Sequence, residues 1–322
     1  MGLFDLFGGW AEPDIPSQEG RTVLVTGGNS GLGLETARVL YKKGANVIIT
    51  SRSKDKALKA VEHVQKSGSG GSGKGSVSYM LLDLSEPEDI DKFAAQFKSK
   101  HKKLNLLINN AGVMNIPTRT VNSRGWETQM ATNHIGHFLL TRHLLPQLEA
   151  ATKADPQVRI VNHSSMAHRI ISGASAKAGG VRVGPGFAPS YDGRKAYNPW
   201  EVYCETKMAN VLFTRELNNR LSGKKSKVVS TAAHPGWTAT NLQKNFAERI
   251  GTMLLGQHVV TGALAQLRAA TDPGAKANDY FGPWSVVWGR PTLNATHPVS
   301  QRNENAKKLW NMTEQWTGVK FL

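Results

Sequence analysis

The chain has 322 residues, of which 39% are hydrophobic, and its formal net charge at pH 7 is +16. This length and composition are typical of a globular protein with a sizeable core, and they exclude a disordered or fibrous chain. No run of about 18 apolar residues occurs, which excludes an ordinary membrane-spanning helix. The nearest approach, Gly251–Leu264, is interrupted by Gln257 and His258, and it predicts a buried or pocket-lining helix.

The positive charge is spread along the chain and does not form one basic tract. Its densest clusters, Lys98–Lys103 and Lys224–Lys227, lie near the ends of predicted helices, where cations oppose the negative end of the helix dipole. No zinc-finger, homeodomain or RNA-recognition signature accompanies them. We therefore expect no nucleic-acid partner.

Residues 1–20 are interpreted as an N-terminal arm preceding a single domain over residues 21–322. The start of the arm is apolar but lacks the basic residues and cleavage site of a secretory signal. We expect the arm to pack on the domain or on a sister subunit of a homo-oligomer; membrane-surface contact through residues 1–10 is the alternative. The single cysteine, Cys204, excludes an internal disulfide and predicts a reducing, cytoplasmic compartment.

From residue 22 onward, short β-branched runs alternate with longer amphipathic runs. The predicted strands are Thr22–Thr26, Asn46–Thr50, Val77–Leu84, Leu104–Asn109, Arg159–Ser164 and Lys227–Ala233. The predicted helices follow the first glycine turn up to Lys43 and then span Lys54–Lys66, Pro87–Lys100, Trp126–Leu148 and Tyr203–Leu221. This alternation predicts an α/β fold, a Rossmann-type doubly wound parallel sheet with helices on both faces. Its ligand crevice is expected at the carboxyl ends of the strands.

Two segments interrupt the alternation. Residues 67–76 are almost wholly Gly and Ser, which predicts a flexible surface loop. Residues 166–200 are rich in Gly, Ala and basic residues, and they predict an elaborated loop near the mouth of the pocket.

A glycine-rich turn joins the first strand to the first helix. A turn of this kind lets backbone N–H groups approach a pyrophosphate, whose charge the helix N-terminus favours. The spacing is G-x-x-x-G-x-G, and the residues expected to contact a dinucleotide are Gly27, Asn29, Ser30, Gly31, Leu32 and Gly33.

The residues after the second strand indicate which dinucleotide binds. A site for NAD usually has Asp or Glu here, whereas this chain has Ser51, Arg52 and Ser53. Because a guanidinium complements a 2′-phosphate and a carboxylate repels it, Arg52 predicts NADP.

Tyr203 and Lys207 are four residues apart, so they share one face of a helix. An ammonium beside a phenol favours the phenolate, so we expect the pKa of Tyr203 to be lowered toward neutrality. Tyr203 would then serve as a general acid or base.

Taken together, these motifs resemble the short-chain dehydrogenase/reductase family. They comprise the glycine turn, Asn109–Gly112, the distant Asn133, the pair Ser164–Ser165 and the Y-x-x-x-K of Tyr203. The strings Asn133–Phe138, Ser165–His168 and His234–Gly236 are similar to the retinol dehydrogenase-like branch. This resemblance implies an NADP-dependent enzyme that interconverts lipophilic carbonyls and alcohols.

The resemblance also implies roles for individual residues. Tyr203 exchanges a proton with the substrate oxygen, Ser165 hydrogen-bonds that oxygen, Lys207 holds the nicotinamide ribose, and Asn133 kinks its helix and supports a proton relay to Lys207. The further cofactor contacts it implies are Asp83, Leu84, Asn110, Ala111, Gly112, Pro235, Gly236 and Thr238.

Two other functions compete with this interpretation: a catalytically silent NADP-binding regulator and a basic nucleic-acid-binding protein. No metal is expected at His134, His137 and His143, because no acidic ligand cluster follows them. Cys204 is expected to pack rather than react. Four tryptophans would either line an apolar pocket or belong to the core or a subunit contact: Trp284, Trp288, Trp310 and Trp316.

Overall fold

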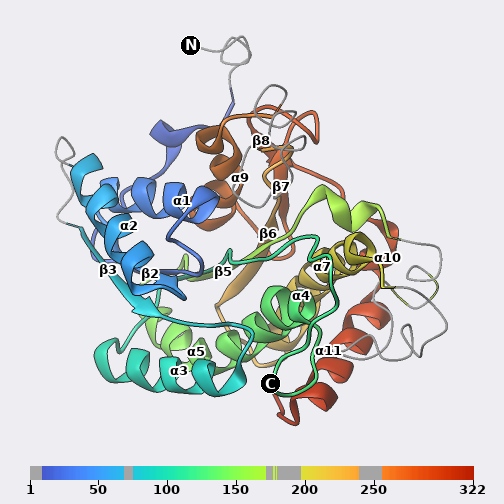
Figure 1. Cartoon of the computed structure of the whole chain (residues 1–322). Helices are drawn as coiled ribbons and strands as arrows, with labels where there is room; N and C mark the ends of the chain where they lie inside the picture. The colour runs from blue at the N-terminus through green and yellow to red at the C-terminus, as the bar shows by residue number, and fades with distance from the viewer. Residues whose placement is uncertain (1–8, 69–74, 172–176, 178, 180–196, 239–255) are drawn as a thin grey trace.

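The computed structural model describes residues 9–68, 75–171, 177, 179, 197–238 and 256–322. Within these residues one sheet has the strand order β3-β2-β1-β4-β5-β6-β7-β8 (Figure 1). The strands are β1 (Thr22–Val25), β2 (Asn46–Ser51), β3 (Ser76–Leu81), β4 (Leu106–Asn109), β5 (Arg159–His163), β6 (Val229–Ala233), β7 (Tyr280–Pro283) and β8 (Pro291–Leu293). All neighbours run parallel except β7 and β8. The order reverses between β1 and β4, which confirms the doubly wound Rossmann-type fold.

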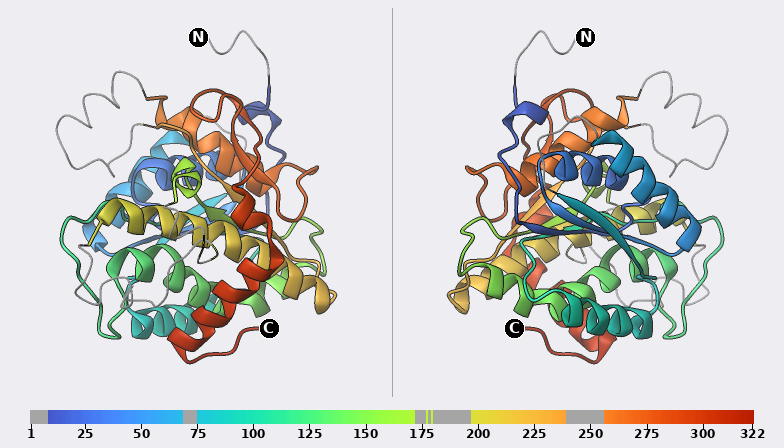
Figure 2. Two further views of the ribbon diagram at one scale, coloured as in Figure 1. Left: turned by 90° about the vertical axis from the view of Figure 1, so that its right-hand side faces the viewer. Right: turned by 90° about the vertical axis from the view of Figure 1, so that its left-hand side faces the viewer.

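Helices cover both faces of the sheet (Figures 1 and 2). One layer contains α1 (Gly31–Lys42), α2 (Lys54–Ser67) and α9 (Val259–Thr271). The other contains α3 (Pro87–Lys100), α5 (Gly136–Ala151) and α7 (Pro199–Gly223), with α11 (Asn303–Thr317) packed on α7. The shorter helices are α4 (Thr128–Met130) and α10 (Pro298–Gln301).

The central strand shows why the sequence folds in this way. Val23 and Val25 pack into the core beneath α1 and α9, whereas Leu24 packs into the core on the opposite face. All three side chains are fully buried. The buried positions on both faces of this strand are therefore all apolar, as expected for a parallel sheet covered on both sides.

The helix predicted over Trp126–Leu148 is not continuous. After α4, the chain forms a π-helical turn over Ala131–Ile135, in which the amide of Gly136 bonds to the carbonyl of Ala131, and α5 follows. The predicted kink at Asn133 therefore coincides with a π turn, a feature that often marks a functional site.

Other elements differ at their ends. The third strand ends at Leu81, before the predicted Leu84, and α7 begins at Pro199, where Asn198 caps its first turn. Strands β7 and β8 were not predicted, because the first contains Gly and Pro and the second has only three residues. The basic clusters do lie at helix ends, with Lys98 and Lys100 in the last turn of α3 and Lys224 at the C-cap of α7.

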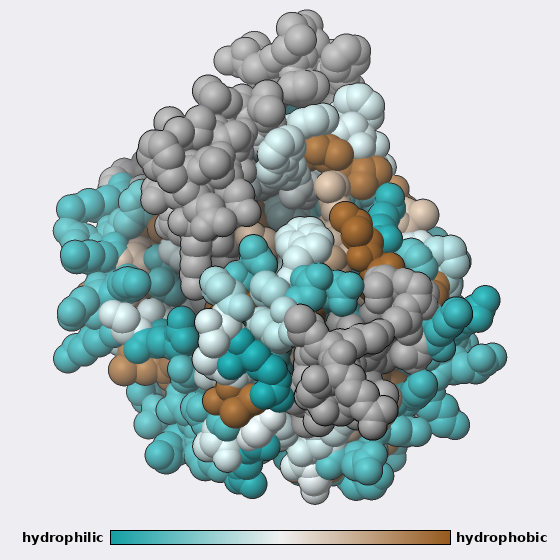
Figure 3. Space-filling model, turned by 45° about the vertical axis from the view of Figure 1, so that its right-hand side comes forward, coloured by the Kyte–Doolittle hydropathy of each residue, from teal (hydrophilic) through white to brown (hydrophobic). Residues whose placement is uncertain are grey.

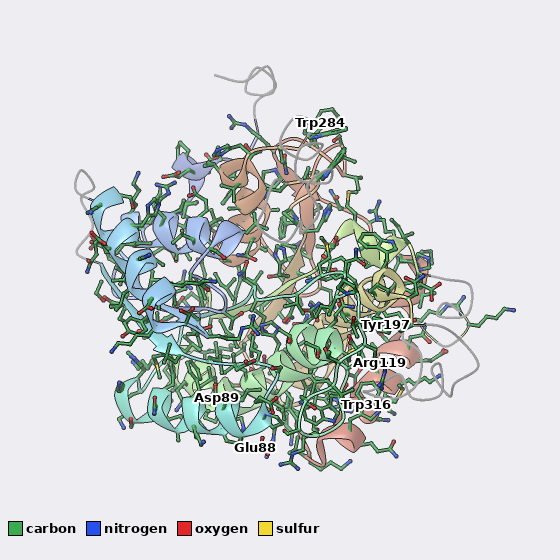
Figure 4. The ribbon with its side chains drawn as sticks, viewed as in Figure 1. Glu88, Asp89, Arg119, Tyr197, Trp284 and Trp316 are labelled. Carbon is green, nitrogen blue, oxygen red and sulfur yellow. The ribbon has the colours of Figure 1, made fainter. Side chains whose placement is uncertain are left out.

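Several sequence predictions fall partly outside the described residues: residues 1–8 of the arm, 69–74 of the Gly/Ser loop, most of 172–196 and residues 251–255. The described part of the arm packs on the domain, since Ile15 is buried in the α1–α9 core and the carbonyl of Gly9 accepts a bond from Arg290. The segment 166–200 is not all loop, because Met166–Arg169 forms a 3-10 helix. At its other end Tyr197, labelled in Figure 4, donates to Glu127 Oε1 at 3.0 Å just before α4.

Candidate active site

A cleft of about 1370 Å³ lies at the carboxyl ends of the strands. Ser165, Tyr203 and Lys207 line this cleft. So does every other residue predicted to bind the cofactor, namely Gly27, Asn29, Ser30, Gly31, Leu32, Gly33, Arg52, Asp83, Leu84, Asn110, Ala111, Gly112, Pro235, Gly236 and Thr238. Asn133 does not line the cleft and is fully buried behind it.

The glycine turn is shaped for close approach to a ligand. Gly27 has a φ of +63°, which side chains disfavour, and a Cβ on Gly33 would lie 2.5 Å from Nδ2 of Asn110. Because α1 begins at Gly31, its N-terminal amides open onto the cleft. This cradle fits the pyrophosphate of a dinucleotide.

Thr26, just before the turn, joins three elements through its hydroxyl. Its Oγ1 accepts bonds from the amides of Asn110 and Ala111, both at 2.9 Å, and lies 2.9 Å from Nε2 of His137. Nδ1 of His137 lies 3.1 Å from the carbonyl of Asn133, so Nδ1 carries the proton and Thr26 donates to Nε2. Burial lowers the pKa of His137 to about 4, which keeps the ring neutral.

The side chain of Asn133 holds the segment that follows β4. Its Oδ1 accepts from the amide of Val113 at 2.8 Å, and its Nδ2 donates to the carbonyl of Val113 at 2.9 Å. Nδ2 also donates to Thr206 Oγ1 on α7 at 3.0 Å. Asn133 therefore positions the cleft wall against α7.

Three of the four predicted catalytic residues, Ser165, Tyr203 and Lys207, come together on α7 and just after the end of β5. Lys207 Nζ lies 5.5 Å from the ring centre of Tyr203, and the neighbouring Ser165 hydroxyl acts to lower the pKa of the Tyr203 phenol. Ser164 has a different role, since its hydroxyl donates to the carbonyl of Lys207 at 2.8 Å and ties β5 to α7.

The expected lowering of the Tyr203 pKa is wrong for this structure. Burial raises the pKa of Tyr203 to about 12, against the smaller opposing effect of the Ser165 hydroxyl. Burial also lowers the pKa of Lys207 to about 8. The physical reason is that both groups lie deep in the protein, where the charged form of each loses its hydration.

A polar corner of the cleft contains the predicted 2′-phosphate contact. The Arg52 side chain is 66% exposed, and its Nη1 lies 3.9 Å from Asp83 Oδ2. Asp83 is the one carboxylate among the described residues that line the cleft. Lys56, in the first turn of α2, lines the same cleft and was not identified from the sequence, although its place one turn after Ser53 is a usable signal.

An apolar wall adjoins the Ser165–Tyr203 pair, and sequence reasoning missed it. It is formed by Met114, Met166, Ala167, Ile170 and Trp200. The Trp200 ring lies 5.5 Å from that of Tyr203, and the Ile170 side chain is 59% exposed. Trp200 stands three residues before Tyr203, so helical spacing could have indicated it.

The remaining sequence candidates have structural roles. Cys204 is buried against Ala167 and Tyr203, and burial raises the pKa of its thiol to about 12, so it packs as predicted. His134 contacts Thr313 on α11, and His143 pairs with Asp91.

None of the four C-terminal tryptophans lines the cleft among the described residues. Trp310 is buried between Phe138, Phe213 and Phe321, and Trp316 packs on the same core. Trp284, at the opposite end of the molecule from Trp316 in Figure 4, is 57% exposed.

On the face drawn in Figure 3, apolar residues gather in the upper part and hydrophilic residues cover most of the rest. No described helix is both long and apolar enough to cross a membrane.

Comparison with known proteins agrees with this geometry. The family model for short chain dehydrogenase matches residues 21–178. The chain is 35% identical to retinol dehydrogenase 12 of Bos taurus, over 94% of this chain and 88% of the relative, and 33% identical to a short-chain dehydrogenase/reductase of Armillaria gallica, over 95% and 93%. A crystal structure of a protein from Mycobacterium paratuberculosis aligns with a TM-score of 0.75 at 31% identity, covering 98% of this chain and all of the other. The chain belongs to the short-chain dehydrogenase/reductase family, with the retinol dehydrogenases among its relatives.

Proposed function

We propose that this oxidoreductase uses NADP to interconvert a carbonyl and an alcohol on a lipophilic small molecule. The observation that carries the proposal is that Ser165, Tyr203 and Lys207 line the same cleft as the glycine turn. A nicotinamide cofactor, when bound, supplies or accepts hydride in such a site.

The residues of the chain handle the proton. A phenol with a pKa near 12 stays protonated at neutral pH, which suits Tyr203 to donate its proton to the oxygen of a carbonyl substrate. Ser165 lines the cleft together with Tyr203, and its hydroxyl would also contact that oxygen. Lys207, donor-only and held at 3.3 Å from the carbonyl of His163, would bind the ribose hydroxyls and stabilise negative charge on Tyr203 after transfer.

The preference for NADP over NAD rests on the polar corner. Arg52 and Lys56 both line the cleft there, and Ser51 and Ser53 stand where an NAD site usually carries a carboxylate. Two cations and a helix N-terminus favour a 2′-phosphate. The nearby Asp83 is turned partly inward, because its Oδ1 accepts from Ser85.

The apolar wall favours a lipophilic substrate. Met114, Met166, Ile170 and Trp200 offer contact area and no hydrogen-bonding partner for a sugar or an acid, apart from the indole N–H. Relatives with retinol dehydrogenase in their names are consistent with such a substrate. The single cysteine is consistent with a cytoplasmic location.

The catalytic assignment is tested by Tyr203→Phe, which removes one oxygen atom. Turnover of aldehydes and ketones with NADPH should fall by at least about a hundredfold, the size of a general acid–base contribution. Binding of NADPH, followed through quenching of Trp200 and Trp237 in the cleft, should be nearly unchanged. Retained turnover in this variant would refute the mechanism, and binding without any turnover in the native chain would favour the silent regulator.

The cofactor assignment is tested by titrating NADPH and NADH into the native chain and into Arg52→Ala. The native chain should bind NADPH more tightly, and Arg52→Ala should weaken NADPH by about tenfold, the value of one charge-assisted contact, without affecting NADH. Arg124→Ala is the matched control, since Arg124 is an exposed arginine paired with Glu88 outside the cleft. Equal affinity for both cofactors in the native chain would overturn the NADP assignment.

A further inference from the structure

His163 is a buried polar residue of the cleft that the proposed mechanism does not use. It is the last residue of β5, immediately before Ser164 and Ser165. Only 8% of its surface is exposed, yet it lines the cleft together with Tyr203 and Lys207.

Both ends of this residue are held in place by neighbouring helices. Its carbonyl accepts bonds from Lys207 Nζ at 3.3 Å and from Asn210 Nδ2 at 2.9 Å, both on α7. Its ring Nδ1 lies 2.7 Å from Oε1 of Gln266 on α9. His163 is therefore fixed between the two layers of helices.

The surrounding bonds determine which ring nitrogen carries the proton. Asn110 Nδ2 donates to the carbonyl of Thr26, so Asn110 Oδ1 is an acceptor that faces Gln266 Nε2 at 3.3 Å. Gln266 Nε2 also donates to Thr36 Oγ1 at 2.9 Å, which leaves Gln266 Oε1 to accept from Nδ1 of His163. Nδ1 is the protonated nitrogen, and Nε2 is an acceptor.

No described residue hydrogen-bonds this acceptor. Burial lowers the pKa of His163 to about 3, and the neighbouring Lys207 lowers it further, so the ring stays neutral. A neutral acceptor that lines the cleft repels phosphate oxygens and can accept a hydrogen bond from water or from a donor of a bound molecule.

The dinucleotide offers two kinds of donor at the Lys207 end of the cleft: the ribose hydroxyls and the N–H groups of the carboxamide. Lys207 is donor-only and suits the oxygens of the ribose hydroxyls. Thr238, another of the expected cofactor contacts, donates its hydroxyl proton to the carbonyl of Pro235 at 2.6 Å. Its Oγ1 can still accept one N–H of the carboxamide, but an amide carries two such protons, so a second acceptor at this end of the cleft would pair the other.

We propose that Nε2 of His163 accepts a hydrogen bond from the nicotinamide carboxamide and so sets the orientation of the ring in front of Tyr203. This inference rests on the proposed function, because it requires a nicotinamide cofactor in the cleft. His163 is thus a positioning residue for the hydride-carrying ring, held by Gln266 in the tautomer that the contact needs.

The test compares three ligands by equilibrium binding: NADP⁺, its 3-acetylpyridine analogue, in which a methyl ketone replaces the carboxamide and removes its N–H groups, and 2′-phospho-ADP-ribose, which has no nicotinamide. The native chain should bind NADP⁺ about tenfold more tightly than the acetylpyridine analogue, the value of one hydrogen bond whose loss leaves a buried acceptor unpaired.

The variant His163→Asn should remove that preference. Its amide nitrogen, at the position of Nδ1, still donates to Gln266, but no acceptor reaches the position of Nε2. Affinity for NADP⁺ should fall to that for the analogue, with 2′-phospho-ADP-ribose unchanged. His163→Gln, whose amide oxygen reaches the position of Nε2, should retain part of the preference. His143→Asn is the matched control, because His143 pairs with Asp91 outside the cleft.

Two results would overturn the inference: a preference for NADP⁺ that survives in His163→Asn, or an equal loss of affinity for all three ligands, which indicates a purely structural role. If His163→Asn does not fold, the native chain alone decides, since equal binding of NADP⁺ and the analogue also overturns it. Failure of the native chain to bind any of the three ligands would instead contradict the proposed function.

Discussion

Removing the hydroxyl of Thr26 should destabilise the protein far more than removing its methyl group. Thr26→Val keeps the shape of the side chain but leaves His137 Nε2 and the Ala111 amide without a partner, whereas the Asn110 amide retains the carbonyl of Ile108 at 2.9 Å. Each unpaired buried group costs about 1–3 kcal/mol. Because Ala111 is only partly buried, we expect a total loss of about 3 kcal/mol in the free energy of unfolding.

Thr26→Ser is the matched control, because it keeps every bond and loses one methyl group worth about 1 kcal/mol. Urea unfolding of both variants measures the difference, with the slope of the transition checked for two-state behaviour. Thr26→Val should therefore be about 2 kcal/mol less stable than Thr26→Ser. Equal stabilities would refute the assignment of the Thr26 hydroxyl as the junction between β1, the segment after β4 and α5.

Two further predictions concern charge and packing. Because burial lowers the pKa of Lys207 to about 8, the ammonium loses its proton as the pH rises through that value. We expect kcat/KM for carbonyl reduction to fall above about pH 8, and a profile that stays flat to pH 10 would contradict the assignment. Trp310 is 1% exposed and lies between α5 and α7. Its replacement by Ala should lower the free energy of unfolding, measured by denaturant melts, by about 3–5 kcal/mol. The exposed Trp284→Ala is the control, and similar losses in both variants would count against the core assignment.

The sequence alone was sufficient for the features whose chemistry is local. A glycine turn between a strand and a helix, Arg52 after the second strand, and Tyr203 and Lys207 one helical turn apart are each contained in a short segment. Their meaning follows from backbone geometry and helical spacing. The alternation of apolar strands and amphipathic helices also predicted the doubly wound sheet, because each strand carries its burial pattern in its own residues.

Tertiary structure decided what depends on neighbours distant in the chain. The sequence suggested that Lys207 lowers the pKa of Tyr203, but burial by the surrounding elements has the larger effect and raises it. The sequence also did not distinguish the buried Trp310 from the exposed Trp284, because a core position and a surface position differ only in what packs against the ring. His163 acquires its tautomer from Gln266, which is 103 residues later in the chain. Burial and hydrogen-bond partners are properties of the assembled layers, so the residues by themselves could not determine them.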